Sequence, residues 1–365
     1  MAELKNITGA LLIDATAAFL NGAGLGTGED KNKVIPKTFR EKINGKAEEV
    51  PYVSAQSWRR WLRDTTNEEN GWNPSELRAI KQSAKGSTSK IATELNPIDF
   101  PEDDLFGYMS SGGNIENNEE DGDKTNSEDS DKKKKTKAES IQRTSPFKSS
   151  ILKGIRNMRV MNIDEAFVHL KEGSPLPYST RFYSSHLEGF FNLEYYRLGQ
   201  YDNLGSHQEL SIELTKTHED KFDISDLPNA NPNAKHKRYT LKDAQSNRKK
   251  HASGLLKGLA FLRGGAKQSA FGSDVSPKVL ILAGMESANP VFNNIFIGTG
   301  EKPALNIDVI KQIANDYKSK LATPIYIGIR AGYLQNEDDI KALGEGFVID
   351  SPIGIVNTFN ENYLK

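Results

Sequence analysis

The sequence predicts an α+β protein whose sheet is interrupted by long insertions. Residues 4–20 alternate like a strand, and strand formers crowd residues 179–201. A long amphipathic helix precedes an apolar strand at 279–282, and a second helix at 307–321 leads to a strand at 324–329. The order strand, helix, strands, helix, strand is compatible with a ferredoxin-like or RRM core.

Composition sets limits on the kind of protein. The 365 residues are enough for one elaborated domain or two ordinary ones, and they include no cysteine. The lack of cysteine excludes disulfides, thiolate zinc sites and iron–sulfur clusters, and it suits a cytoplasmic location. No run approaches the roughly 18 apolar residues of a membrane span, and the polar start 1–6 does not read as a secretory signal.

The net charge of −1 is the sum of a strongly acidic segment and a basic remainder of the chain. Residues 101–131 hold 11 acidic residues and one lysine, and without them 47 basic residues face 38 acidic ones, a net charge of +9. An excess of this size is typical of proteins that bind polyanions.

A glycine-rich stretch follows the first strand. Leu4–Leu20 is predicted as a long strand, and Asn21 and Gly22 begin a run of glycines that ends at Gly28. A strand followed by glycines suggests a dinucleotide site, which requires a helix to open at the glycines. Residues 29–36 read as a loop instead, so a flexible glycine loop is preferred and a nucleotide-dependent enzyme is kept as an alternative.

A short helix after Pro51 combines tryptophans with arginines. Ser54 is predicted to cap it, and Trp58, Trp61 and Leu62 form one stripe. The tryptophans are interpreted as core anchors in preference to platforms for stacked bases.

Three arginines lie almost opposite that stripe: Arg59, Arg60 and Arg63. Guanidinium groups engage phosphates in a forked geometry that lysine lacks. Pairing with Asp64 or Glu68 is the alternative.

The long helix of residues 241–263 is basic. Its apolar residues recur at three- and four-residue steps, and its lysines fall on one flank of that stripe: Lys242, Lys249, Lys250 and Lys257. Arg263, Gly264 and Gly265 end the helix, and Lys267 and Gln268 add donors beside the glycines. This combination suits a phosphate cradle, although a solvated helix with an ordinary glycine cap remains equally open.

Two segments show little periodicity in their apolar residues. Residues 65–98 are polar and weakly helical. Residues 110–137 have almost no apolar side chains and include Lys132–Lys135, so a disordered acidic insertion is predicted.

No catalytic constellation is evident. The six histidines show no ligand pair at helical spacing, and the chain has no Walker lysine and no serine elbow. We therefore expect no metal, no cofactor and no catalytic residue. Asp14 and Asp30 require partners supplied by the fold, and RNA cleavage through Asp30 is the enzyme hypothesis kept. Glu188–Phe191 resembles the RNA-stacking strand of an RRM only weakly.

Several motifs together resemble a known family. Tyr52–Asp64, Leu262–Gln268 and Asp274–Pro277, with the strand Gly9–Asp14 and the following Asn21-Gly22, are similar to the backbone subunit of type I CRISPR Cascade complexes. The likeness is to the DevR-type members of type I-B systems. The acidic insertion departs from it.

The resemblance implies a modified RRM palm with helical fingers and a thumb-like hairpin insertion. The segments would be divided as follows: 1–64 the first part of the palm, 65–178 the finger insertion including the acidic loop 110–137, 179–203 palm strands, 204–238 the thumb-like excursion, and 239–365 the completion of the palm.

The resemblance also implies a function. Copies of such a subunit assemble along a guide crRNA, grip its backbone and present its bases to a target DNA strand, beside other Cascade subunits. The RNA-binding residues would be Asn21, Gly22, Trp58, Arg59, Arg60, Arg63, Arg263, Gly264, Gly265, Lys267 and Gln268. Gly264 and Gly265 are expected to leave clearance for RNA. The alternative is a type III-like subunit that cleaves target RNA with a loop aspartate, for which Glu29 and Asp30 occupy the position without matching the motif.

Overall fold

The computed structural model describes residues 2–25, 33–43, 45–82, 88–110, 140–155, 161–168, 171–174, 176–205, 207–228, 236–298 and 301–364. None of the helices in these ranges is long and apolar enough to cross a bilayer. The predicted acidic insertion lies, apart from Ser110, outside them.

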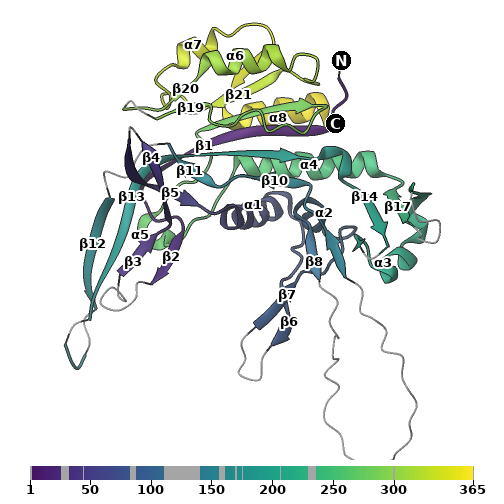
Figure 1. Ribbon diagram of the computed structural model, residues 1–365, viewed down its shortest axis with the longest axis horizontal. Coiled ribbons are helices and arrows are strands. Elements are labelled where there is room, and N and C mark those ends of the chain that lie inside the picture. Colours follow the sequence, from purple (N-terminus) through teal and green to yellow (C-terminus); the bar gives the residue numbers. More distant parts are fainter. Residues whose placement is uncertain are drawn as a thin grey trace, which may run out of the picture. The chain divides into compact units, whose positions relative to one another are not determined.

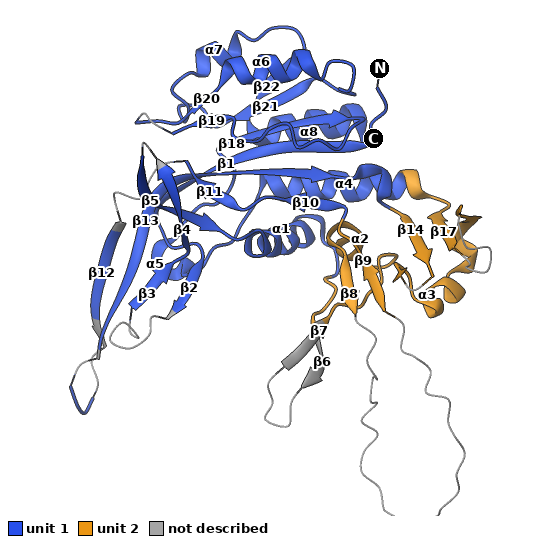
Figure 2. Ribbon diagram, in the orientation of Figure 1, with its two compact units in different colours: residues 1–73, 146–198, 246–365 blue, residues 74–145, 199–245 orange. Residues whose placement is uncertain are grey.

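The chain forms two compact units, each assembled from separate stretches of sequence (Figure 2). Unit 1 comprises residues 1–73, 146–198 and 246–365, and unit 2 comprises residues 74–145 and 199–245. Part of the segment predicted as fingers therefore folds together with the segment predicted as the thumb.

A 12-stranded sheet forms the centre of unit 1 within the described residues (Figure 1). Its main path runs in the order β22-β21-β18-β1-β13-β11-β5-β4. These strands are β1 (Asn6–Ala18), β4 (Thr38–Ile43), β5 (Lys46–Val53), β11 (Leu152–Gly154), β13 (Leu176–Leu193), β18 (Val279–Met285), β21 (Ile325–Ile329) and β22 (Phe347–Asp350).

Four further strands join this sheet beside the main path, and two short strands pair with each other. The added strands are β2 (Gly22–Leu25), β3 (Lys33–Pro36), β10 (Phe147–Ser149) and β12 (Met161–Val168), of which β12 and β10 pair with β13. The separate pair is β19 (Phe296–Ile297) with β20 (Ala304–Leu305).

The middle of the sheet contains a split crossover. β13 and β18 are both antiparallel to β1, which lies between them, so β13 and β18 run parallel to each other. The chain returns from β13 to β18 through helix α4 (Ala244–Ala260). A parallel pair that encloses a third strand is the arrangement of a ferredoxin-like or RRM core. The predicted α+β class is confirmed.

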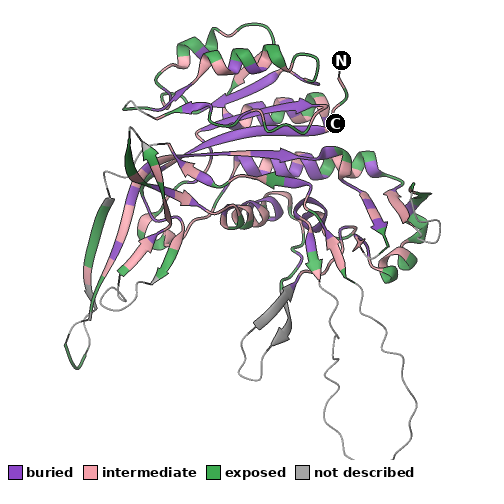
Figure 3. Cartoon of the chain, in the orientation of Figure 1, coloured by how far each residue is buried: buried purple, intermediate pink, exposed green. Residues whose placement is uncertain are grey.

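Helices cover the two faces of this sheet. β18 is buried along its whole length and β1 along most of its length, as expected for strands packed on both sides (Figure 3). On one face Ala10, Leu12 and Ile281 pack with Ile310 and Ile313 of α6. The helices of unit 1 besides α4 are α1 (Ala55–Asn70), α5 (Gln268–Phe271), α6 (Ile307–Asp316), α7 (Glu337–Lys341) and α8 (Pro352–Tyr363), with a 3-10 turn, η2 (Tyr195–Arg197).

The opposite face receives α8. A Cβ atom on Gly328 of β21 would lie 2.6 Å from Cα of Pro352, so only glycine lets α8 lie this close. The rings of Tyr326 and Phe359 meet edge to face, with centroids 5.4 Å apart.

Helix α4 confirms the predicted amphipathic helix, although it begins at Ala244 and Leu241 belongs to the preceding strand. Glycines let α1 and the nearby Trp72 approach α4: a Cβ atom on Gly258 would lie 2.1 Å from Oγ1 of Thr66, and one on Gly254 would lie 2.5 Å from the Trp72 ring. The predicted apolar stripe is buried: Leu241, Ala244, Ala252, Leu255, Leu256, Leu259 and Leu262.

Unit 2 is built on a six-stranded sheet in the order β16-β17-β14-β15-β9-β8 within the described residues. Its core contains Tyr201, Leu210, Phe222 and Leu241. The elements of unit 2 are β6 (Arg78–Gln82), β7 (Thr88–Ala92), α2 (Pro101–Phe106), β8 (Tyr108–Ser110), β9 (Ile141–Arg143), β14 (Gln200–Leu204), β15 (His207–Gln208), α3 (Ile212–Thr217), η3 (Glu219–Lys221), β16 (Phe222–Asp226) and β17 (His236–Leu241).

A buried arginine organises unit 2. The side chain of Arg143 has no exposed surface, and its guanidinium lies 2.5 Å from Oδ1 of Asp104 and 3.1 Å from Oε2 of Glu209. It also lies 4.5 Å above the ring of Tyr201. Arg143 pairs with Tyr108 across β9 and β8, so this cluster lies at the base of the two strands that flank the acidic insertion in the sequence.

Two local predictions were wrong. Beyond Asn70 the segment expected to be weakly helical forms the hairpin β6–β7, because pairing between its two strands outweighs a weak helical period. Residues 22–25 and 33–36, expected as a loop, form β2 and β3, because they pair with each other and β3 runs along β13.

Candidate nucleic-acid interface

Asn21 joins the end of β1 to the start of α1. Its side-chain oxygen accepts from the backbone N–H of Ser54 at 3.1 Å, and its amide nitrogen donates to Oγ of Ser57 at 3.1 Å. Ser54 caps the helix as predicted, accepting from the N–H of Ser57 through its own Oγ. Asn21 thus positions the arginine helix. Gly22 follows it as the first residue of β2 and pairs with Pro36 of β3.

The glycine loop after α4 reaches the same place. The N–H of Ala266 donates to the carbonyl of Leu20 at 2.9 Å. On the other side of the loop, the N–H of Arg263 donates to Oγ1 of Thr65 in α1 at 3.1 Å. Two constellations almost 200 residues apart in sequence therefore converge on the end of β1.

Gly264 and Gly265 pack against the protein itself. Their φ angles are 150° and 108°, which side chains rarely adopt. A Cβ atom would lie 2.3 Å from Cγ of Trp61 at Gly264 and 2.5 Å from Nε2 of Gln268 at Gly265. This close packing is by itself a reason for glycine at both positions, and the clearance expected for RNA stays a prediction.

Lys267 and Gln268 are anchored in different ways. The Lys267 ammonium donates to Oγ1 of Thr180 in β13 at 2.7 Å and lies 5.5 Å from the centre of the Phe19 ring. The Gln268 amide donates to the carbonyl of Gly264 and holds the loop closed. Lys267 thus places a charge beside the glycine loop, whereas Gln268 fixes the shape of the loop.

Arg263 is paired with acidic residues of α1. Its guanidinium lies 2.8 Å from Oε2 of Glu68 and 2.6 Å from Oε1 of Glu69, and these contacts raise its pKa. A phosphate at Arg263 would compete with two carboxylates that are already bound.

Arg59 and Arg63 have a different environment. Arg59 donates from Nη1 to the carbonyl of Phe147 at 2.5 Å and lies over the Phe147 ring. Burial, together with the neighbouring Arg63, lowers the pKa of Arg59 to about 10, so Arg59 remains charged at neutral pH. Like charges four residues apart on a helix repel each other. A phosphate beside them would relieve this repulsion.

The remaining residues of α1 divide between core and surface. Trp58 is fully buried and donates from its indole to the carbonyl of Ser150 at 2.7 Å, so the prediction of a core anchor is confirmed. Arg60 forms an exposed ion pair with Asp64 at 3.0 Å, which is the alternative that the sequence left open.

Residues not singled out from the sequence complete the interface. Phe19, Phe182 and Phe271 form an aromatic cluster beside Lys267, with Phe271 centred 6.4 Å from Phe19 and 5.5 Å from Phe182. Thr180 holds the ammonium of Lys267. Their positions in three distant segments give no local signal that could have grouped them.

The structure brings partners to Asp14 but supplies no metal ligand set. Asp14 faces His186 across β1 and β13, and Nδ1 of His186 lies 2.8 Å from the hydroxyl of Tyr333. Burial, with a smaller contribution from Asp14, raises the pKa of Tyr333. Within the described ranges no three His, Asp or Glu residues are placed to hold a metal ion. Asp30 lies outside them.

Comparison with known proteins gives the chain a family. The family model described as "CRISPR-associated negative auto-regulator DevR/Csa2" matches residues 16–302. No match is found among curated proteins. A solved "CRISPR RNA-guided surveillance complex, pre-nicking" contains a chain of similar fold, with a TM-score of 0.52, 12% identity, and coverage of 98% of this chain and 99% of that one. A "CRISPR RNA-guided surveillance complex" gives a TM-score of 0.48 at 12% identity, with coverage of 98% of each chain. The protein therefore belongs to the DevR/Csa2 family of CRISPR-associated proteins.

Proposed function

We propose that this protein is a guide-RNA-binding backbone subunit of a Cascade-type CRISPR effector. Several copies assemble along a crRNA, hold its phosphates and leave its bases available for pairing with a target DNA strand. Family membership and the fold shared with a chain of an RNA-guided surveillance complex support this proposal.

The observation that carries the proposal is the Arg59–Arg63 pair at the junction of β1, α1 and the loop 263–268. Arg59 is desolvated by burial and repelled by Arg63. A bound polyanion offsets both effects, as expected for a surface that binds phosphates. Lys267 adds a third cation at the same junction.

The β12–β13 hairpin fits the thumb better than residues 204–238. β12 pairs with β13 from Met161↔Tyr183 to Val168↔Leu176, and Figure 1 shows these strands leaving the sheet as an arm. Ile163 and Tyr178 on this arm are 52% and 39% exposed, which suits contact with another copy. Residues 204–238 instead contribute strands and a core residue to unit 2.

The subunit binds RNA without cleaving it. This part of the proposal rests on the sequence, since Glu29 and Asp30 do not match the motif of the cleaving subunits; Asp30 itself lies outside the described residues. Assembled protein incubated with complementary RNA and Mg²⁺ is expected to leave that RNA intact, and cleavage that disappears in Asp30→Ala would establish the alternative.

Salt titration tests the proposal. Affinity for long RNAs should vary little with sequence and should fall linearly on a log–log plot against salt. Arg59→Lys/Arg63→Ala keeps a donor at position 59 but removes one cation, so the slope of log affinity against log salt should become less steep. Lys311→Ala, at an exposed position of α6, removes the same single charge and should leave the slope unchanged. Affinity that does not depend on salt, or that is confined to one sequence, would contradict the proposal.

A further inference from the structure

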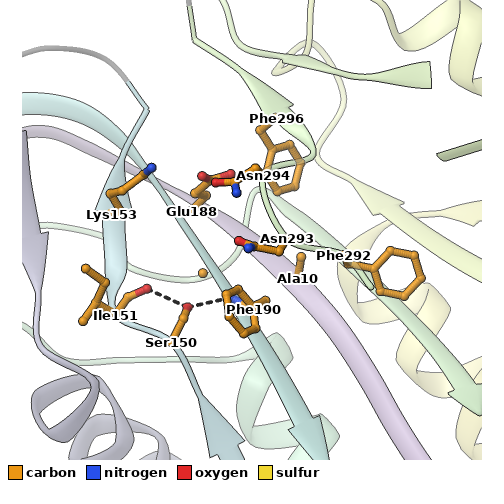
Figure 4. Close-up of a pocket in the computed structure, with 11 residues that line it drawn as sticks. Ala10, Ser150, Ile151, Lys153, Glu188, Phe190, Phe292, Asn293, Asn294 and Phe296 are labelled. Carbon is orange, nitrogen blue, oxygen red and sulfur yellow. Dashed lines mark hydrogen bonds between the residues drawn. The ribbon is translucent and has the colours of Figure 1, made fainter. Parts of the chain in front are cut away.

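A cavity of about 180 Å³ opens on the sheet of unit 1. It is bounded by β1, β11, β13 and the loop before β19, and Lys153, Glu188 and Asn294 lie close together at it (Figure 4). An engineered cavity of about 150 Å³ is large enough to bind benzene, so this one has room for one planar ring system. The polar and aromatic residues around it include Lys153, Glu188, Phe190, Asn293, Asn294 and Phe296.

Glu188 places a carboxyl group at this cavity. The residue is only 9% exposed, and burial is the main reason that its pKa is raised to about 7, with Glu41 adding to the rise. Lys153 and the backbone N–H of Phe296 act in the opposite direction. The carboxyl group is therefore held at the edge of the cavity, where the loss of hydration outweighs the favourable effects of Lys153 and the Phe296 N–H.

Lys153 supplies a donor beside this acceptor. Lys153 and Glu188 are directly opposed on β11 and β13, so their side chains leave the sheet as neighbours. The Lys153 ammonium lies 3.6 Å from Oε1 of Glu41, which keeps it at the rim. Figure 4 shows its end directed towards Glu188 and Asn294. An acceptor and a strong donor thus stand side by side.

Aromatic and amide groups complete the lining. Phe190 is half-buried on β13, on the same face as Glu188, and Phe296 lies across the cavity. Asn293 and Asn294 are exposed in a loop, and Asn294 has a φ angle of 53°. Apolar ring faces bordered by a few polar groups are what a flat heterocycle with a polar edge requires.

We propose that this cavity binds a nucleobase with a keto group beside a ring N–H, guanine above all. The Lys153 ammonium donates to the keto oxygen, and the Glu188 carboxylate accepts from the adjacent N–H. Guanine offers the carboxylate a second donor, its exocyclic amino group, which uracil lacks. Adenine and cytosine place an amino group against the ammonium and an acceptor against the carboxylate, so both are disfavoured.

Two sources supply this chemistry: a free guanine nucleotide, or one unstacked base of a bound strand. The second source rests on the proposed guide-RNA function, whereas the first does not. The site lies on different elements from the Arg59–Arg63 pair, so its occupancy and the grip on phosphates are separable.

Calorimetry with single nucleotides tests the pocket directly. The wild-type protein should bind GMP at least about tenfold more tightly than AMP, because the wrong edge leaves charged groups without partners. Binding of GMP should tighten as the pH rises from 6 to 8, because the carboxylate form of Glu188 accepts its donors. Glu188→Gln should remove the preference, and Glu345→Gln, the same change on an exposed loop, should keep it.

Short RNAs separate the two sources. If a bound strand supplies the base, a seven-nucleotide oligouridine with one central guanosine should bind more tightly than the same oligomer with a central adenosine, and Glu188→Gln should abolish the difference. If only GMP shows the preference, the free nucleotide is the ligand. Equal binding of GMP and AMP by the wild-type protein, at every pH, would overturn the pocket even if long RNAs still bind in a salt-dependent manner. Failure to bind long RNA would instead refute the proposed function.

Discussion

The backbone of Gly264 lies against the indole of Trp61: a Cβ atom on Gly264 would lie 2.3 Å from Cγ of Trp61. This contact joins the loop after α4 to α1. It explains why glycine stands at a position with a φ angle of 150°. The same contact keeps Arg263 beside Glu68 and Glu69.

Gly264→Ala is expected to destabilise the protein by about 2 kcal/mol or more, because the added methyl group meets an aromatic ring and the φ angle is unfavourable. Urea unfolding followed by tryptophan fluorescence measures this change. Gly272→Ala is the control, since Gly272 has a φ angle of 55° with nothing near its Cβ position, and its cost should stay near 1 kcal/mol. Equal costs at both positions would mean that the Trp61 contact is unimportant.

Arg63→Ala is expected to weaken RNA binding while leaving the free protein about as stable as before. The substitution removes the phosphate contact proposed above and relieves the repulsion of Arg59, and a change at a half-buried helix position of this kind should alter stability by less than about 0.5 kcal/mol. Fluorescence anisotropy with labelled RNA and thermal unfolding provide the two measurements. A large loss of stability would show that Arg63 is structural, and wild-type affinity would remove it from the interface.

Arg143→Met is expected to cost about 3–5 kcal/mol, because it leaves the buried Asp104 and Glu209 facing each other without their shared cation. Arg238→Met in the same unit is the control. Arg238 binds Asp202 at 2.7 Å but is partly exposed, so its loss should cost below about 1 kcal/mol. Chemical unfolding of the two variants compares these values, and a similar loss in both would contradict the role given to Arg143.

Glu188 should make stability depend on pH. Its folded-state pKa of about 7 lies above the ordinary value of 4.5, so the native state retains a proton that the unfolded chain releases. The stability that the native state gains from holding this proton is fully present below pH 4.5 and is lost as the pH rises through about 7. The free energy of unfolding should therefore fall more steeply between pH 5 and pH 8 in the wild-type protein than in Glu188→Gln. Identical pH profiles would show that Glu188 is not held as described.

The elements with strong local signals were predicted from the sequence. β1 follows from its alternating pattern, α1 from the Ser54 cap and its tryptophan stripe, and α4 from its leucine spacing. The hairpin β6–β7 and the pair β2–β3 were missed, because what determines them is pairing with another strand rather than a local period.

The candidate site was predicted as a set of residues and not as a geometry. Arg59 and Lys267 were identified because guanidinium and ammonium groups suit phosphates. Their anchors, Phe147 and Thr180, come from other segments and leave no trace in local spacing. The cavity at Glu188 depends on a partner across the sheet in the same way, since Lys153 stands 35 positions earlier in the chain.

The number of protein copies bound to one RNA tests the backbone role most directly. Native mass spectrometry of the protein saturated onto RNAs of increasing length and unrelated sequence gives this number. A backbone subunit predicts that the count rises linearly with RNA length and that Arg59→Lys/Arg63→Ala lowers the occupancy at each length. A count that stays at one copy, whatever the length of the RNA, would contradict it.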